Sequence, residues 1–215
     1  MTFEGLMDYA QRHMAAQEWM LAADRFHEAH RVDSVSPLPR AGLGRIALIM
    51  GRMAEGISLL DAVLAEHPTC VEALIARAMA DDDEGRTLEA VELYERALEL
   101  APEHSEALAG LGLAMARLGR WRQSRHFLKK ALATMSEPEI LSAYAVASFQ
   151  DGDVREGIGV LCHSIARNPN HVDSIAALSD MLVAVGQKGT AAQLLDNSLV
   201  RTADTSLRAR RRALA

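Results

Sequence analysis

Two cysteines, eight histidines and several serines are the side chains of this chain with the chemistry for catalysis or metal binding. His27 and His30 are three residues apart, so a helix would place both on one face, where they could hold a metal ion. No acidic or cysteine ligand follows at a matching spacing, as it does in the H-E-x-x-H pattern. We therefore interpret these histidines as surface residues and predict no metal site, with a metal-binding pair as the alternative.

The cysteines and serines also lack the neighbours that an active site needs. Cys162 is followed by His163, but consecutive residues of a helix point to different faces, so this histidine is not placed to activate the thiol. No glycine-rich phosphate loop occurs. No G-x-S-x-G setting surrounds the candidate nucleophiles Ser142, Ser164 and Ser174. We predict that the protein is not an enzyme and needs no cofactor.

The elements that would have to position such residues follow a repeat of about 34 residues. One copy, from Val71 to His104, reads VEALIARAMADDDEGRTLEAVELYERALELAPEH, and the next begins at Ser105 with SEALAGLGLAMARLGRWRQSRHFLKKALATMSE. A fixed period of this length is typical of stacked helical hairpins, each a helix A followed by a helix B. Six copies in one register, the fourth a residue short, start at Phe3, Pro37, Val71, Ser105, Pro138 and Val172.

These copies resemble the tetratricopeptide repeat (TPR) family. That family has characteristic residues at repeat positions 4, 7, 8, 15, 20, 27 and 32, and the copy from Val71 carries there Leu74, Arg77, Ala78, Gly85, Ala90, Ala97 and Pro102. Arg77 departs from the pattern, which has a large apolar residue at position 7. The resemblance implies an all-α fold, a right-handed superhelical solenoid of six TPR hairpins over residues 3–205, followed by a basic tail or capping helix at 206–215.

Elementary chemistry explains the pattern. Glycine at position 15 can take the left-handed conformation that ends helix A, and this position holds Gln17, Gly51, Gly85, Gly119, Gly152 and Gly186. Small residues at positions 8, 20 and 27 let helices approach closely, and large ones at 4, 7 and 24 fill the space between hairpins. Thr69 with Glu72, and Asp153 with Glu156, have the spacing of capping boxes.

The acidic run from Asp81 to Glu84 ends a helix A, where negative charge opposes the helix dipole. Arg77 lies one turn before Asp81, so we predict that the two form a partly buried ion pair. The run is then either an internal polar network with a solvated acidic tip or a docking site for a basic partner.

Composition and charge restrict the partners. The formal net charge of −6 and the absence of a broad basic face argue against nucleic acid, and Arg208 to Arg212 suit the end of a capping helix. No run of about 18 apolar residues occurs, so we predict no membrane insertion. The N-terminus lacks a basic segment followed by an apolar one, so we expect no signal peptide and a cytoplasmic protein. Cys70 and Cys162 lie in separate repeats and are predicted to be free thiols.

In TPR proteins, helix A lines the concave face, and peptides bind there. The resemblance implies a groove at positions 2, 5, 9, 12 and 13, with the predicted lining Met7, Gln11, Arg45, Leu48, Ile75, Met79, Asp82, Leu113, Val146, Phe149, Asp180 and Val183. Position 2 adds an acidic row, with Glu4, Glu72, Glu106, Glu139 and Asp173. The groove lacks the Lys/Asn/Arg set with which some members grip a C-terminal carboxylate.

An apolar floor beside an acidic row suits an amphipathic helix or an extended segment with Lys or Arg flanks. The sequence therefore predicts a non-enzymatic adaptor, scaffold or chaperone-like module that binds a peptide or helix of another protein in its groove. Two alternatives stay open: a self-associating scaffold that forms homo-oligomers, and the TPR targeting segment of a larger enzyme. The apolar floor could also be covered by the chain's own tail or by a second copy.

Overall fold

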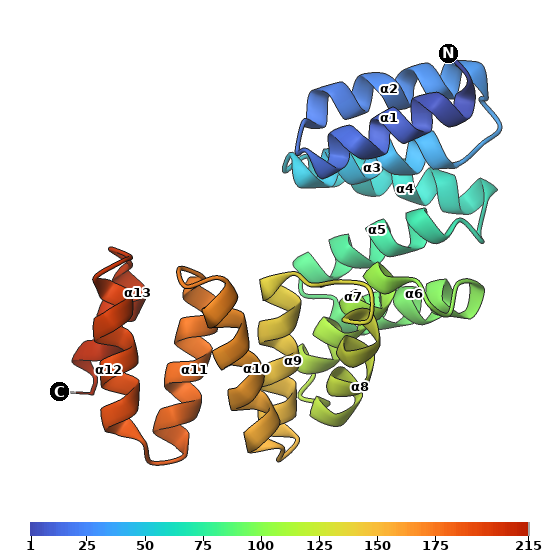
Figure 1. Cartoon of the computed structure of the whole chain (residues 1–215). Coiled ribbons are helices and arrows are strands. Elements are labelled where there is room, and N and C mark those ends of the chain that lie inside the picture. The colour runs from blue at the N-terminus through green and yellow to red at the C-terminus, as the bar shows by residue number, and fades with distance from the viewer. Residues whose placement is uncertain (215) are drawn as a thin grey trace. The chain divides into compact units, whose positions relative to one another are not determined.

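A computed structural model describes residues 1–214 of the chain, and the regular structure of these residues is helical (Figure 1). Within them, helices α1–α12 form six consecutive hairpins, and α13 follows. The all-α prediction is confirmed. The helix bounds in chain order are α1 Phe3–Ala15, α2 Trp19–Val32, α3 Leu38–Ile49, α4 Met53–Glu66, α5 Val71–Asp83, α6 Thr87–Leu100, α7 Ser105–Arg117, α8 Trp121–Ala131, α9 Pro138–Gln150, α10 Val154–Arg167, α11 Val172–Ala184, α12 Lys188–Leu199 and α13 Thr205–Arg212.

The helices keep the register of the sequence repeat. Each helix A begins at the predicted start of its repeat, except that α3 begins one residue later, at Leu38. The B helix α8 has 11 residues, whereas α2, α4, α6 and α10 have 14 each. It belongs to the fourth repeat, the one that is a residue short.

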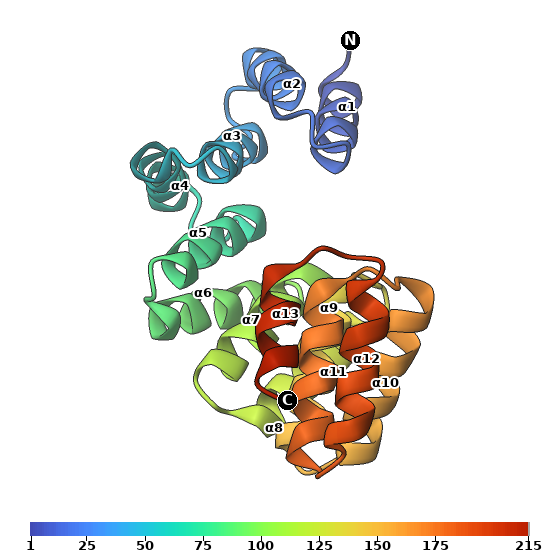
Figure 2. The same cartoon turned by 90° about the vertical axis from the view of Figure 1, so that its left-hand side faces the viewer.

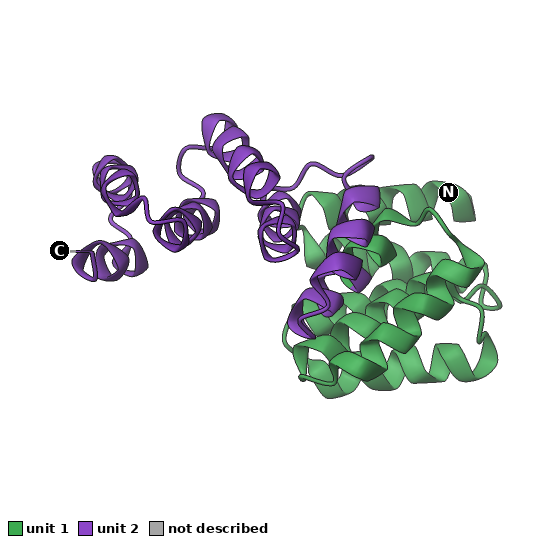
Figure 3. Ribbon diagram, turned by 90° about the horizontal axis from the view of Figure 1, so that it is seen from below, with its two compact units in different colours: residues 1–110 green, residues 111–215 purple. Residues whose placement is uncertain are grey.

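The chain groups into two compact units (Figure 3). The first covers residues 1–110 and the second begins at Leu111, so the division falls inside α7. In the first unit, α3 packs against its hairpin partner α4 and against α2 and α5. In the second unit, α9 packs against α8, α10 and α11, and α13 contacts α11 and α12 (Figure 2). Each unit thus builds its core from neighbouring hairpins.

The turn between helices A and B has the same backbone in every repeat. Repeat position 15 takes a positive φ in all six, namely Gln17 at 60°, Gly51 at 76°, Gly85 at 81°, Gly119 at 70°, Gly152 at 97° and Gly186 at 81°. A Cβ atom on any of the five glycines would meet nothing within 4 Å. Backbone conformation rather than space therefore favours glycine here, and Gln17 is the one residue that adopts it with a side chain.

Close contacts between helices explain the small residues. Positions 8, 20 and 27 are buried in every repeat, as predicted. At Gly112, a Cβ atom would lie 2.6 Å from Cγ of Leu128, which fills position 24 of the same repeat and is itself fully buried. A larger side chain at Gly112 would therefore require Leu128 or its helix to move.

Of the two predicted capping boxes, the one at Asp153 forms its N-cap bond, while the N–H of Asp153 bonds the carbonyl oxygen of Ser148 and not Glu156. Asp153 caps α10, and its Oδ1 accepts a hydrogen bond of 3.1 Å from the backbone N–H of Glu156. The prediction for Thr69 was wrong, because α5 begins one residue later, with Cys70 at its N-cap and no side-chain cap bond. The N–H of Cys70 instead closes a turn on the carbonyl oxygen of His67, at 3.1 Å.

The C-terminal helix α13 starts at a strong cap. Asp204 accepts from the backbone N–H groups of Ser206 and Leu207, at 2.8 and 2.9 Å. Leu207 is fully buried in a cluster with Ile175 of α11 and Leu195 of α12. Leu207 therefore anchors the otherwise basic helix on the last repeat, together with the ion pairs of Arg210 with Asp180 and of Arg211 with Asp196.

We predict that Ala97→Leu destabilises the chain by ~1–3 kcal/mol, because Ala97 is fully buried at position 27 and a larger side chain would overpack the helix contact. Thermal melts of the variant and the parent measure the effect. Ala101→Leu, at a half-buried site just after α6, is the control and should change the melting temperature little. An unchanged melt of Ala97→Leu would contradict the close contact.

We predict that Gln17→Gly stabilises the chain. The left-handed conformation costs a side-chain residue ~1–2 kcal/mol, and the added freedom of glycine in the unfolded chain offsets ~0.4–1 kcal/mol of that gain. The reverse change at an equivalent turn, Gly119→Gln, should lower the melting temperature, since its Cβ meets no neighbour and only the backbone is strained. If both changes shift the melting temperature in the same direction, the backbone conformation is not the cause.

Candidate partner-binding surface

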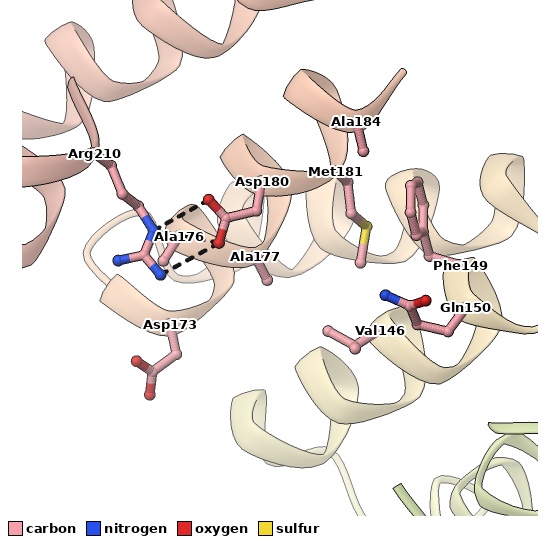
Figure 4. A pocket seen from close by; sticks show the side chains of 10 residues that line it. All are labelled: Val146, Phe149, Gln150, Asp173, Ala176, Ala177, Asp180, Met181, Ala184 and Arg210. Atoms are coloured by element: carbon pink, nitrogen blue, oxygen red, sulfur yellow. Dashed lines mark hydrogen bonds and ion pairs between the residues drawn. The ribbon is translucent and has the colours of Figure 1, made fainter. Parts of the chain in front are cut away.

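The second unit carries a pocket of about 390 Å³ lined by the A helices α9 and α11 and by Arg210 of α13 (Figure 4). Its lining is Val146, Phe149, Gln150, Asp173, Ala176, Ala177, Asp180, Met181, Ala184 and Arg210. Alanine side chains on α11 leave the space open, and Val146, Phe149 and Met181 form its apolar walls. Two carboxylates and one guanidinium lie at the side nearest α13.

Three predicted groove residues, Val146, Phe149 and Asp180, meet in this pocket. Val146 and Phe149 are half-buried because part of each side chain packs against the core cluster around Leu161. The core therefore holds them in place while their remaining surface faces the pocket.

Two further predicted residues of the second unit lie elsewhere. Val183 lines a neighbouring pocket of about 410 Å³, which shares Asp180, Ala184 and Arg210 with the first. Leu113 is half-buried on α7 and lines neither pocket.

Arg210 is a pocket residue that the sequence analysis did not assign to the site. Its Nε lies 3.2 Å from Oδ1 of Asp180 and its Nη2 lies 3.3 Å from Oδ2, so the two form an ion pair at the rim (Figure 4). The two residues are 30 positions apart, so the sequence does not reveal the pairing. The basic tail and an acidic residue at position 9 of the last repeat are the only signals for it.

The first unit has a smaller pocket of about 80 Å³, lined by Met7, Gln11, Met14, Phe26, Leu38, Ala41, Gly42, Arg45 and Glu72. Three predicted groove residues, Met7, Gln11 and Arg45, meet there. Arg45 of α3 forms a bidentate ion pair with Glu106 of α7, with 2.9 Å between Nη1 and Oε2. This pair joins the second repeat to the fourth. The charge of Arg45 is therefore neutralised within the unit and is not available to a ligand.

The prediction that Ile75 is exposed in the groove was wrong, because its side chain is 2% exposed. The same repeat position, 5, is buried in every repeat after the first, so it belongs to the packing between hairpins. Met7 is half-buried, since the first helix of the array has a neighbouring repeat on one side only. The other predicted residues on these helices, Leu48, Met79 and Asp82, are half-buried.

The acidic row at position 2 is partly neutralised. Glu106 pairs with Arg45, and Oε1 of Glu139 lies 3.3 Å from Nε2 of His171. Glu72 and Asp173 are exposed and line the pockets of the first and second unit. Fewer unpaired carboxylates therefore lie at the pockets than the acidic row at repeat position 2 predicts.

The acidic run contains the predicted ion pair. Arg77 Nη1 lies 2.5 Å from Oδ1 of Asp81, whose side chain is only 4% exposed, and this confirms the pair. The same oxygen also accepts from Nε of Arg86 at 2.7 Å, and Nε of Arg77 donates to Asp61 at 2.7 Å. Asp81 thus belongs to an internal network that ties the fifth helix to its neighbours, while Asp83 and Glu84 are exposed.

A carboxylate, an imidazole and a hydroxyl follow one another from α9 to α11. Beyond its contact with Glu139, His171 has Nδ1 2.8 Å from Oγ of Ser174. The order resembles a hydrolase triad, but Ser174 is fully buried and also contacts the hydroxyls of Ser142 and Ser164. Nδ1 of His171 caps α11 by accepting from the N–H of Ser174 at 3.3 Å. A buried hydroxyl in this setting stabilises helix packing and cannot reach a substrate.

The remaining candidate residues are separate from one another. Cys70 is buried and Cys162 exposed, and both thiols are free. Burial raises the pKa of the Cys70 thiol, which keeps it protonated. Among residues 1–214, no three metal-ligating side chains come together, and no helix there has the length and apolar character to cross a membrane.

Several known proteins resemble this chain in sequence. The tetratricopeptide repeat model matches residues 83–147. The chain is 26% identical over 192 residues to the CTR9 homolog of Arabidopsis thaliana, a match that covers 86% of this chain and 18% of that protein. It is 35% identical over 108 residues to the uncharacterized protein y4yS of Sinorhizobium fredii, which covers 50% of this chain and 57% of that one. The chain thus spans only part of the length of both relatives.

Solved structures agree. PilF of Pseudomonas aeruginosa superposes with a TM-score of 0.77 over 99% of this chain and 97% of that one, at 14% identity, which shows the fold alone. With the repeat register described above, the match of residues 83–147 and the shared fold confirm the predicted resemblance to the tetratricopeptide repeat family. The fold is that of a protein–protein interaction scaffold, and proteins of this family are generally not enzymes.

We predict that Asp81→Leu destabilises the chain by ~1–3 kcal/mol, because it leaves the guanidinium of Arg77 with Asp61 as its sole partner at a largely buried position. The double change Arg77→Leu with Asp81→Leu should cost less, since it removes both charges. Thermal melts compare the two variants. If Asp81→Leu melts at the same temperature as the parent, the acidic run from Asp81 to Glu84 acts as a docking surface. The change should then weaken salt-dependent binding of a partner instead of lowering stability.

Proposed function

We propose that this protein is a non-enzymatic adaptor that holds a segment of a partner protein against the pocket of its second unit. The observation that carries the proposal is the open apolar pocket between two A helices, with Val146, Phe149 and Met181 as its walls and Asp173 at its edge. Apolar side chains grouped around an open pocket suit the binding of an apolar anchor from a partner.

The chemistry of the pocket indicates what the partner presents. A volume of about 390 Å³ accommodates one or two large aliphatic side chains, and fully burying one leucine or methionine contributes about 1.5–3 kcal/mol. One such anchor gives at most millimolar affinity. The partner segment must therefore continue along the helices, as an amphipathic helix or an extended strand does.

Charge at the edge selects the flanks of that segment. Asp173 is exposed and has no ion-pair partner within the described residues, so a lysine or arginine beside the apolar anchor would pair with it. Arg210 already neutralises Asp180, which limits the acidic character of the pocket to one end.

The two alternatives from the sequence have distinct signatures. A self-associating scaffold would change its mass with concentration in light scattering. A targeting segment of a larger enzyme would be revealed by the length of the parent protein. The cytoplasmic location and the chaperone-like role remain predictions.

We predict that Val146→Glu with Ala184→Glu lowers capture of the partner at least tenfold. Each change puts a carboxylate into the pocket, and leaving it desolvated and unpaired costs more than the ~1.4 kcal/mol that a factor of ten represents. Binding is measured by affinity capture from a lysate of the source organism, with mass spectrometry of the retained proteins.

The control is Ala65→Glu with Val200→Glu, which makes the same chemical change at two exposed sites outside the pocket. It should retain the partner. Both variants should keep the helical circular dichroism of the parent. Loss of helicity in the pocket variant alone would show that Val146 is core, and retention of the partner by a folded pocket variant would place the binding site elsewhere.

A further inference from the structure

Charge is strongly segregated between the two units. Residues 1–110 hold 9 basic and 20 acidic side chains, a formal charge of −11, whereas the residues from 111 onward hold 14 basic and 9 acidic side chains, a charge of +5. The net charge of −6 conceals this opposition. The second unit is therefore basic, although the whole chain is acidic.

The acidic charge gathers on the B helix α6 of the first unit. Spacings of three, three and four residues place four exposed glutamates on one face of this helix, namely Glu89, Glu92, Glu95 and Glu99. Within the described residues, none of them has an ion-pair partner, and Leu88 beside them is 57% exposed. We call this surface the acidic face.

The basic charge gathers on the B helices α8 and α10 of the second unit. Exposed cations without an ion-pair partner among the described residues are Arg122, Lys129, Lys130, Arg155 and Arg167. Arg125 holds the two helices in register, because its Nη2 pairs with Asp153 at 2.9 Å and with Glu156 at 2.5 Å at the start of α10. Val154, next to Arg155, is 37% exposed. We call this surface the basic face.

The acidic face is unfavourable on its own, since like charges one turn apart on a helix, as its glutamates are, destabilise it by ~0.2–0.5 kcal/mol per pair. A surface of opposite charge relieves this repulsion. A nucleic acid or an anionic membrane would satisfy the basic face but would be repelled by the −11 unit on the same chain. A second copy of this chain offers both complements, and each face also presents an exposed aliphatic side chain for contact, Leu88 and Val154.

We propose that copies of this protein associate head to tail, with the acidic face of one copy against the basic face of the next. Such a contact joins two different surfaces, so it generates rings or open filaments rather than a closed symmetric pair. It uses the B helices and is therefore independent of the proposed pocket, which is built from A helices. Because the attracting charges are exposed, the association is weakened by salt.

The test is the weight-average mass by sedimentation equilibrium. The mass should be at least twice the 23.4 kDa of the monomer at an ionic strength of about 0.01 M, where the Debye length is ~30 Å, and should return to the monomer value at about 1 M, where it is ~3 Å. Charge reversal on the acidic face, by Glu92→Lys with Glu95→Lys and Glu99→Lys, should leave the protein monomeric at both ionic strengths.

Charge reversal on the other side completes the design. Arg122→Glu with Lys129→Glu and Lys130→Glu should also be monomeric alone, whereas a mixture of the two triple variants should associate, because one then carries two basic faces and the other two acidic faces. A control with the same change in net charge at exposed acids elsewhere, Glu4→Lys with Asp24→Lys and Glu103→Lys, should associate like the parent.

The proposal is overturned if the parent is monomeric at low salt, or if the triple reversals leave its mass unchanged. It is also overturned if the mixture of triple variants does not associate while both are folded by circular dichroism. Binding of a single-stranded oligonucleotide or of phosphatidylserine vesicles by a monomeric parent, lost in the basic-face reversal, would assign that face to a polyanion instead.

Discussion

No helical hairpin of this chain can bury its apolar face alone, and the rest of the structure follows from that constraint. Each hairpin must lie close enough to the next for side chains at repeat position 24 to fill the space between them, as Leu60, Leu128 and Leu161 do while fully buried. Closeness in turn requires glycine, alanine or serine opposite these side chains. At Gly42 of the second repeat, a Cβ atom would lie 2.5 Å from Cζ of Phe26, which fills position 24 of the first repeat.

The same constraint determines which side chains remain available for a partner. Position 5 of each helix A is used for packing, as the burial of Ile75, Ala109 and Ala176 shows. Positions 9 and 12 lie farther from the core, so Val146 and Phe149 keep part of their surface accessible. The pocket of the second unit is therefore a by-product of regular packing, and alanines such as Ala177 and Ala184 give it its depth.

Local signals in the sequence predicted the fold well because the repeat multiplies them. Glycine at position 15 marks five of the turns. The sixth is at Gln17, which gives no turn signal of its own and is identified only by its position in the repeat. Interactions between distant residues were not predictable in the same way. The pairs Arg45–Glu106 and Asp180–Arg210 join residues 61 and 30 positions apart, and only packing brings them together. The burial of Ile75 was missed for the same reason. A repeat position predicts the face of the helix on which a residue lies, but it does not predict which neighbouring helix packs against that face.

Internal pairing then separates the roles of the two helix layers. On the A helices, Arg45 and Asp180 already have intramolecular partners. Shape, apolar surface and the free carboxylate of Asp173 therefore remain to select a ligand there. On the B helices, the charges of the acidic face and of the basic face have no ion-pair partner within the described residues. Unpaired surface charge acts over the Debye length and steers approach, whereas an apolar pocket acts only at contact. The charges that would select a neighbouring molecule lie on the B helices, and the pocket that would hold a ligand is lined mainly by A helices. Because these are different side chains, the protein can use both surfaces independently.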